Sequence, residues 1–496
     1  MPVPSSRSLL LSLGAFVLAL SQGACGGGTS SGPSGSDSGP ILLIIPPKKD
    51  AGTDAAVKPD ASTPADAGAD VAVGPSDAEL NTYPAFTVPA PQVQHGGGPT
   101  LTNAIFIPVI FAGDEYATQI PTYLQAVATS QYWLDVGKDY GVAAATSSPP
   151  IILNETFPSS LDDNQLQVWL ANKLGLDPRF GAIGESVFDA GGSDGGGIDA
   201  NAPFSDAASR TATAPTGAIY VIFLPGGTQV SLQGQESCVY FGGYHNSFYY
   251  GPNGSTVVYA AIPRCGSFET SSGILSGFNA ISGPTSHELI EAASDPEVAS
   301  NSHYGFDGVD LNDEFWSIVL GGAEVGDMCA QFPGAFYTPS EAALSSYMVQ
   351  RIWSNSAAAA GHDPCVPTPS AQAEPFYFNS VPQNTEVTAT YFGNDFPTQG
   401  IVAPIGQPTT INVRLFSNVS TMGQTWTVTA VDANSLFMGS APVLSFGTTQ
   451  VSGLNGDTVQ LTVTNAGMAG VTTHPYIIES QLGILTNWWI GIVVDN

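Results

Sequence analysis

The chain has 496 residues, a hydrophobic fraction of 43% and a formal net charge of −31, from 42 acidic and 11 basic residues. No lysine follows Lys173, so the chain has too few cations to neutralise a phosphate backbone, which argues against nucleic-acid binding and against attraction to an anionic membrane. The length suffices for two or three domains of roughly 100–200 residues. Excess carboxylate suits an extracellular protein and oxygen-binding cations such as calcium.

Residues 1–25 have the pattern of an export signal. Arg7 precedes an apolar run, Leu9–Leu20, which is too short to span a bilayer as a stable anchor. The small residues that follow end at Cys25, and this arrangement resembles a bacterial lipoprotein cleavage site. Cys25 would then become the lipidated first residue and anchor the protein to a membrane. The alternative is ordinary secretion with cleavage near Ala24, and in both cases the protein leaves the cytoplasm.

Residues 26–98 have the composition of a disordered tether. The segment Gly26–Pro40 is rich in glycine and serine, and Asp50–Asp77 consists mainly of alanine, aspartate, proline, glycine, valine and threonine. Such a composition cannot bury enough apolar surface to offset the entropy lost on ordering. We therefore expect a long arm between the export signal and the first folded domain.

Residues 99–367 alternate between strand and helix patterns. Buried strands are predicted at Ala104–Phe111, Ile219–Leu224 and Ser255–Ile262, and helices at Ile120–Tyr140, Leu161–Leu174 and Ile274–Ser294. The apolar face of the first helix comprises Tyr123, Leu124, Val127, Tyr132, Trp133 and Val136. This order predicts an α+β or α/β domain.

Residues 368–496 show a different pattern. Short strand patterns occur at Thr409–Phe416, Thr425–Val431, Asp457–Val463 and Asn487–Val494, separated by glycine, asparagine and aspartate. No long helical period is present. We predict an all-β module, most simply an immunoglobulin-like sandwich.

The strongest chemical signal is the segment from Ser286 to Pro296. His287 and Glu291 are four residues apart, so on a helix they lie on one face and can bind a single divalent metal. Glu288 stands where the glutamate of a His-Glu-x-x-His metallohydrolase acts as general base. Asp295 and Pro296 end the helix directly after the motif. The alternative is a polar helix face without a metal, but the surrounding sequence contains few glutamates and histidines.

A zinc site needs a third protein ligand and an open water position. Three downstream acids are candidates, in the order Glu324, Asp327 and Asp295. Carboxylate oxygens are harder ligands than imidazole nitrogens, so a site of two carboxylates and one imidazole also suits calcium or manganese as an alternative to zinc.

Four cysteines remain after Cys25, and in an exported chain they suggest two disulfides with three connectivities. We favour Cys238–Cys265 and Cys329–Cys365, because each pair brackets one compact segment. His245 lies inside the first of these loops. It is a candidate catalytic group that stabilises an oxyanion, or else a loop histidine bonded to backbone.

Two aspartate-rich loops are candidate calcium sites. One contains Asp189, Asp194 and Asp199, and the other extends from Asp307 to Glu314. Neither has the EF-hand spacing, so solvated acidic loops are the default interpretation.

Several segments resemble the plant EXORDIUM (phosphate-induced protein) family and its bacterial relatives. They are Pro108–Gly113, the Ile120–Tyr140 helix with Tyr132-Trp133, Cys238 with Gly243-Tyr244-His245, Tyr259-Ala260 leading to Cys265, the His287–Glu291 motif with Ser294-Asp295-Pro296, and Asp327-Met328-Cys329. The similarity covers about residues 103–366. It implies an extracellular domain with a metallopeptidase-like helix and no defined reaction. The plant pattern usually has asparagine where this chain has Asp295.

The sequence thus predicts an exported surface lipoprotein with a zinc-dependent, peptidase-like hydrolase domain, acting on a peptide or a cell-surface polymer. The alternative is a non-catalytic extracellular binding or adhesion protein with a structural metal or none. The sequence leaves the oligomeric state open.

Overall fold

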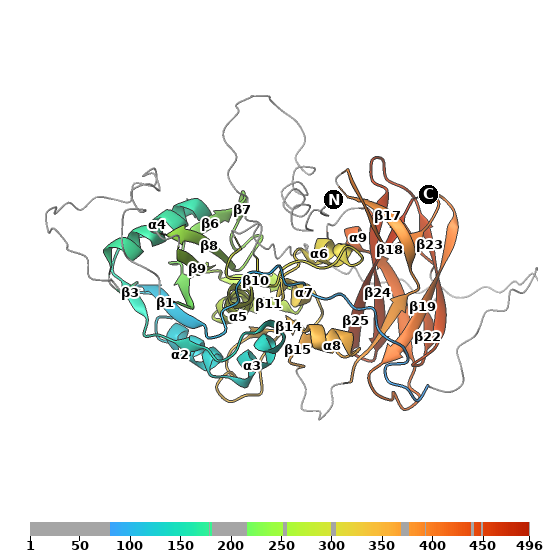
Figure 1. Ribbon diagram of the computed structural model, residues 1–496, viewed down its shortest axis with the longest axis horizontal. Helices are drawn as coiled ribbons and strands as arrows, with labels where there is room; N and C mark the ends of the chain where they lie inside the picture. The colour runs from blue at the N-terminus through green and yellow to red at the C-terminus, as the bar shows by residue number, and fades with distance from the viewer. Residues whose placement is uncertain are drawn as a thin grey trace, which may run out of the picture. The chain divides into compact units, whose positions relative to one another are not determined.

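The computed structural model describes residues 80–177, 179–180, 216–250, 255–298, 304–368, 376–391, 393–437, 441–447 and 450–495. The predictions for the export signal, Cys25 and the tether up to residue 79 lie outside the described residues, as does the loop from Asp189 to Asp199. The chain divides into two compact units, whose described parts are residues 89–368 and residues 80–88 with 376–495 (Figure 1).

The first unit is built on a mixed sheet in the order β2-β1-β5-β9-β8, with β3 also paired to β1. Its strands are β1 (Ile105–Phe111), β2 (Thr146–Ser147), β3 (Ile151–Leu153), β5 (Ala218–Phe223), β8 (Tyr244–Tyr250) and β9 (Ser255–Ile262). All pairs are parallel except β8 with β9, which is antiparallel and places β8 at the edge. The three predicted buried strands are confirmed as β1, β5 and β9.

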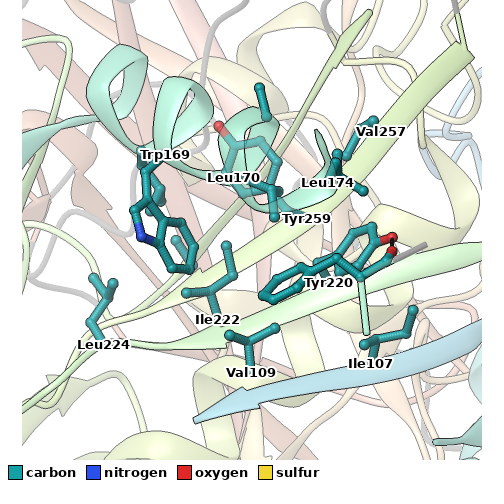
Figure 2. Packing of buried hydrophobic residues seen from close by; sticks show 14 of the residues in the cluster. Ile107, Val109, Trp169, Leu170, Leu174, Tyr220, Ile222, Leu224, Val257 and Tyr259 are labelled. Carbon is teal, nitrogen blue, oxygen red and sulfur yellow. Dashed lines mark hydrogen bonds between the residues drawn. The ribbon is translucent and has the colours of Figure 1, made fainter. Parts of the chain in front are cut away.

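One face of this sheet packs against α4 (Asp163–Leu176). Figure 2 shows Trp169, Leu170 and Leu174 of this helix above the side chains of β1, β5 and β9. The sheet residues on this face include Ile107, Val109, Tyr220, Ile222, Val257 and Tyr259. Helix α4 starts two residues later than predicted, because the side chain of Asp162 caps it by accepting a hydrogen bond from the backbone N–H of Gln165.

The other face of the sheet is covered by α2 (Gln119–Ala128), α3 (Gln131–Gly137) and α5 (Asn279–Ser294) (Figure 1). The prediction of a single helix over residues 120–140 is wrong. The helix is interrupted at Thr129–Ser130, and the segment ends in a 3₁₀ turn, η2 (Lys138–Tyr140). The Ser130 hydroxyl donates to the Val127 carbonyl and accepts from the Trp133 N–H, which ends one helix and starts the next. All six predicted core side chains are buried.

Helix α5 is buried along almost its entire length, from Ala280 to Ser294. It is shorter than predicted, because Gly273–Ser276 forms strand β11 in a hairpin with β10 (Ser267–Thr270). The smaller elements of the unit are β4 (Ser160–Asp162), β6 (Gln229–Leu232), β7 (Gln235–Glu236), α6 (Glu314–Leu320), α7 (Asp327–Ala330), β12 (Phe336–Tyr337), β13 (Val349–Gln350), β14 (Ile352–Trp353), α8 (Asn355–Ala359) and β15 (Cys365–Val366).

The second unit consists of two sheets that form a sandwich-like arrangement, with the orders β16-β19-β23-β21 and β17-β18-β25-β24-β20-β22. Its elements are β16 (Phe378–Pro382), β17 (Thr385–Tyr391), β18 (Asn394–Val402), β19 (Pro408–Ser417), β20 (Trp426–Asp432), α9 (Ala433–Phe437), β21 (Leu444–Phe446), β22 (Val451–Gly453), β23 (Thr458–Asn465), β24 (Thr473–Leu482) and β25 (Leu485–Val494). The four predicted strand patterns correspond to β19, β20, β23 and β25. The described part of the chain is therefore mixed α+β and rich in strands.

The sequence assigns residues 80–98 to the tether, whereas the structure packs them onto the two units. Leu80 and Asn455 exchange hydrogen bonds in the second unit, where Arg414 also lies over the ring of Phe86. In the first unit the Val93 N–H donates to Asn355. Composition alone missed these contacts because they join residues far apart in the chain.

Among the described residues, no helix is both long enough and apolar enough to cross a bilayer.

Candidate metal centre

Helix α5 brings two metal-ligating groups together inside the first unit. The Nε2 atom of His287 lies 2.9 Å from Oε2 of Glu291, one turn further along the helix. Both residues are buried, and beyond their contacts with neighbouring charged groups of the same cluster neither atom has a hydrogen-bond partner. Buried polar atoms need compensation, which this pair finds either as an ion pair or by holding a cation between the two atoms.

Backbone groups at the start of α7 hold the other oxygen of Glu291. Its Oε1 atom accepts hydrogen bonds from the N–H groups of Gly326 (3.0 Å) and Asp327 (3.1 Å). A Cβ atom at position 326 would lie 2.6 Å from this oxygen and 2.7 Å from Nδ1 of His287, so only glycine permits the approach. The carboxylate is therefore fixed with Oε2 directed at His287.

Gln350 of strand β13 fixes the orientation of the His287 ring. Its Oε1 atom lies 2.9 Å from Nδ1 of His287, and its Nε2 atom donates to the carbonyl of Gly326 at 2.7 Å. The second bond assigns the amide orientation, so Nδ1 of His287 carries the proton and donates it to Gln350. Nε2 is then the nitrogen that faces Glu291, and once it is deprotonated its lone pair is available, as in a metal-bound imidazole. Sequence reasoning missed Gln350, because nothing local marks it.

Of the three acids considered as third ligand, Asp327 joins this pair. Its Oδ1 atom lies 3.6 Å from Nε2 of His287, and His287, Glu291 and Asp327 form a buried group able to hold a metal ion. Asp295 instead ends α5 and accepts a hydrogen bond from the N–H of Gly305 at 2.7 Å. Glu324 lies beside His245, with 3.4 Å between its Oε1 and the imidazole Nε2.

His245 reaches the same cluster from strand β8. Its Nδ1 atom lies 3.3 Å from Oε2 of Glu288 and 3.6 Å from Oε2 of Glu291. A second buried group able to hold a metal comprises His245, Glu288 and Glu291. The structure thus brings together His287, Glu288, Glu291, Asp327, Glu324 and His245, of which Glu288 is the most exposed, at 4%.

The neighbours of His245 on strand β8 explain its direction. Tyr244 and Asn246 donate to the two carboxylate oxygens of Asp163 in α4, at 2.7 and 2.9 Å. Successive side chains on a strand point to opposite faces, so anchoring both neighbours to α4 turns His245 towards α5. The His245 ring therefore faces carboxylates, and the alternative interpretation, a loop histidine bonded to backbone, does not describe it.

The crowding of carboxylates changes the proton affinity of the cluster. Burial lowers the pKa of His287, but Glu291 and Glu288 outweigh it and raise this pKa to about 10. Burial likewise opposes protonation of His245, yet Glu324 and Glu288 hold its pKa well above the usual range. Burial raises the pKa of Glu324 and of Asp327, although the adjacent histidines partly oppose this. Protons and metal ions therefore compete for these atoms.

Two separations between the donor atoms lie on either side of the value expected around a zinc ion. Bonds of about 2.0–2.2 Å in a tetrahedral site place neighbouring donors about 3.4 Å apart. His287 Nε2 lies 2.9 Å from Glu291 and 3.6 Å from Asp327, which brackets this value. A nitrogen and two carboxylate oxygens would leave the fourth position for water.

The acidic loop from Asp307 to Glu314 has one notable residue. The carboxylate of Glu314 is buried without a hydrogen-bond partner, and burial followed by repulsion from Asp307 and Asp310 raises its pKa to about 8. A carboxyl with such a pKa carries a proton near neutral pH when no cation is bound.

Both predicted disulfides, Cys238–Cys265 and Cys329–Cys365, are confirmed. The Cys238–Cys265 disulfide closes the segment that contains β8. The Cys329–Cys365 disulfide fixes α7, which contributes Asp327 to the cluster. Disulfides form in oxidising compartments and therefore indicate a location outside the cytoplasm.

No family model matches the chain, and no curated protein matches it. A solved structure of a chimeric titin Z1Z2 functionalized with a KLER exogenous peptide from decorin aligns with 24% of this chain and 97% of its own, at 11% identity and a TM-score of 0.14. A likeness this low supports no conclusion about fold or function.

Proposed function

We propose that this protein is an exported surface lipoprotein whose first unit is a zinc-dependent hydrolase of the metallopeptidase type. The observation that carries the proposal is the convergence of His287 Nε2, Glu291 Oε2 and Asp327 Oδ1 in one buried group, with Glu288 beside it. The lipid would be attached at Cys25. The resemblance to EXORDIUM proteins and an immunoglobulin-like identity for the second unit belong to the same proposal.

His287, Glu291 and Asp327 would hold the zinc ion. A bound zinc ion lowers the pKa of a coordinated water to about 7 and polarises a carbonyl group. Gln350 and the backbone of Gly326 keep the ligands in place before the ion arrives, which reduces the entropy cost of binding.

Glu288 would act as the general base. Its Oε1 atom lies 3.9 Å from Nε2 of His287, close to the metal position but outside the three ligands. From there the carboxylate can accept a proton from the attacking water and return it to the leaving group. His245, 3.3 Å from Oε2 of Glu288, would orient this carboxylate.

The substrate class is a peptide or a cell-surface polymer with amide bonds. The carbonyl carbon of an amide is attacked by water once the metal polarises it, and no redox partner or further cofactor is required. The second unit would bind the substrate or a partner.

The test combines metal content with hydrolysis. Elemental analysis of the full chain should show bound zinc that falls in His287→Ala and Asp327→Asn, whereas the surface variant His362→Ala should match wild type. Cleavage of a mixed peptide library, followed by mass spectrometry, should disappear in Glu288→Gln although zinc remains bound. Absence of zinc from the wild-type protein would refute the proposal.

A second candidate is a non-catalytic surface protein with a structural metal. It is favoured by burial, because every residue of the cluster is at most 4% exposed and structural zinc sites are closed. This candidate expects Glu288→Gln to leave all properties unchanged, including the binding of any partner. The same peptide screen therefore separates the two candidates.

A further inference from the structure

We propose that the cluster holds a second divalent cation, bound by His245 Nδ1, Glu288 Oε2 and Glu291 Oε2, with Glu291 shared between the two ions. This inference rests on the proposed first zinc ion at His287, Glu291 and Asp327, and it adds a regulatory site to the same centre. The three donor atoms belong to a second buried group able to hold a metal.

The distances match those of the first site. His245 Nδ1 lies 3.3 Å from Glu288 Oε2 and 3.6 Å from Glu291 Oε2, near the donor separation of about 3.4 Å expected around a tetrahedral zinc ion. Glu291 Oε2 has no hydrogen-bond partner and faces both imidazoles. One oxygen atom is therefore available to both ions.

The outer contact of His245 repeats that of His287. The Nε2 atom of His245 lies 3.4 Å from Oε1 of Glu324, which has no hydrogen-bond partner. A metal-bound imidazole usually donates its other N–H to a carboxylate or carbonyl. Glu324 can accept a hydrogen bond from this N–H, so that Nδ1 of His245 binds the ion. In the same way Gln350 accepts from Nδ1 of His287, so that Nε2 of His287 binds the first ion.

Charge supports a second ion independently of the distances. Glu288, Glu291, Glu324 and Asp327 carry four negative charges when ionised, and one divalent cation offsets half of them. Among the described residues, the ion pairs of these four carboxylates involve histidine and neither lysine nor arginine. Buried charges need compensation, and two divalent cations would neutralise the cluster while both imidazoles stay neutral.

The second ion would compete with the proposed chemistry. It takes Oε2 of Glu288, the carboxylate proposed as general base, so this group is free to accept a proton only in the one-ion form. Zinc in excess would therefore convert the centre from a hydrolytic form to a closed form.

The experiment is zinc titration of the full metal-free chain, followed by calorimetry and elemental analysis. Wild type and His362→Ala should bind two equivalents, His245→Ala and His287→Ala one each, and Glu291→Ala none. Glu288→Gln, which preserves shape, should keep the first ion and bind the second at least tenfold more weakly. This variant covers the case in which His245→Ala does not fold, as judged by circular dichroism.

Cobalt provides a second readout, because two Co²⁺ ions that share one carboxylate oxygen are spin-coupled in electron paramagnetic resonance. One equivalent in both wild type and His245→Ala, with no coupled signal, would overturn the second site and leave the proposed function intact. Loss of zinc in His245→Ala but not in His287→Ala would instead contradict the proposed first site. Absence of binding in wild type would overturn both.

Discussion

The Nδ1 atom of His287 lies 2.9 Å from Oε1 of Gln350, although the two residues are 63 positions apart in the chain. The same glutamine donates to the carbonyl of Gly326, and its own backbone N–H donates to the Ser286 hydroxyl. One buried side chain thus connects α5 with the loop before α7. The orientation of the imidazole and the position of this loop are set together.

Replacing Gln350 by alanine should weaken zinc binding about 10–100-fold. Losing the hydrogen-bond partner of the other ring nitrogen of a metal-bound histidine usually reduces metal affinity by that factor. Gln350→Glu keeps an acceptor for His287 but loses the donor to Gly326, so its loss should be smaller. Zinc affinity measured against a competing chelator checks both variants. Equal losses would show that the ring orientation of His287 does not depend on this hydrogen bond.

Gly326→Ala should lower the zinc affinity at least tenfold and destabilise the fold by about 1–3 kcal/mol, the usual range for overpacking a well-packed interior. The added methyl group would lie 2.6 Å from Glu291 Oε1 and 2.7 Å from His287 Nδ1. Gly266→Ala is the matched control, because a Cβ atom there meets nothing within 4 Å. Chemical denaturation and zinc titration of both variants test this, and identical behaviour would contradict the described packing.

Two nearby aspartates should respond differently to the same substitution. Asp327→Asn removes the charge of the third ligand and should reduce bound zinc. Asp295→Asn keeps an oxygen that can accept from the Gly305 N–H, so its zinc content should equal that of wild type and its stability should change by less than about 1 kcal/mol. The reverse pattern in elemental analysis would restore Asp295 as the third ligand.

Zinc should stabilise the protein more as the pH rises. Without metal, the raised pKa of His287 provides stability that is complete below 6.5 and is lost as the pH rises towards about 10. Zinc needs the deprotonated imidazole, and each displaced proton adds about 1.4 kcal/mol of binding free energy per pH unit. The raised pKa values of Glu324 and Asp327 act in the same direction.

The measurement is the difference in melting temperature between zinc-loaded and chelator-treated protein at pH 5.5, 6.5, 7.5 and 8.5. The difference should grow across this series in wild type and should grow less steeply in His287→Ala, which lacks the imidazole of the first site. A difference that is independent of pH would mean that protons and zinc do not share these ligands.

Local sequence was sufficient for the elements that are decided by short-range patterns. The spacing of His287 and Glu291 placed them on one helix face, and the buried strands β1, β5 and β9 were identified by continuous apolar runs. Both disulfides followed from cysteine spacing. The break at Ser130 was missed because serine is tolerated within helices, and only its two side-chain bonds end one helix and start the next.

By itself, the sequence determined which helix carries the candidate metal ligands and where that helix ends, since both depend on residues four to eight positions apart. Tertiary structure alone decided that Asp327 joins His287 and Glu291, that Asp295 caps the helix, and that Glu324 pairs with His245. These outcomes depend on how β8, α5 and α7 pack around one another. Atoms within 4 Å in space are separated by tens of residues in the chain, and no local pattern records that distance.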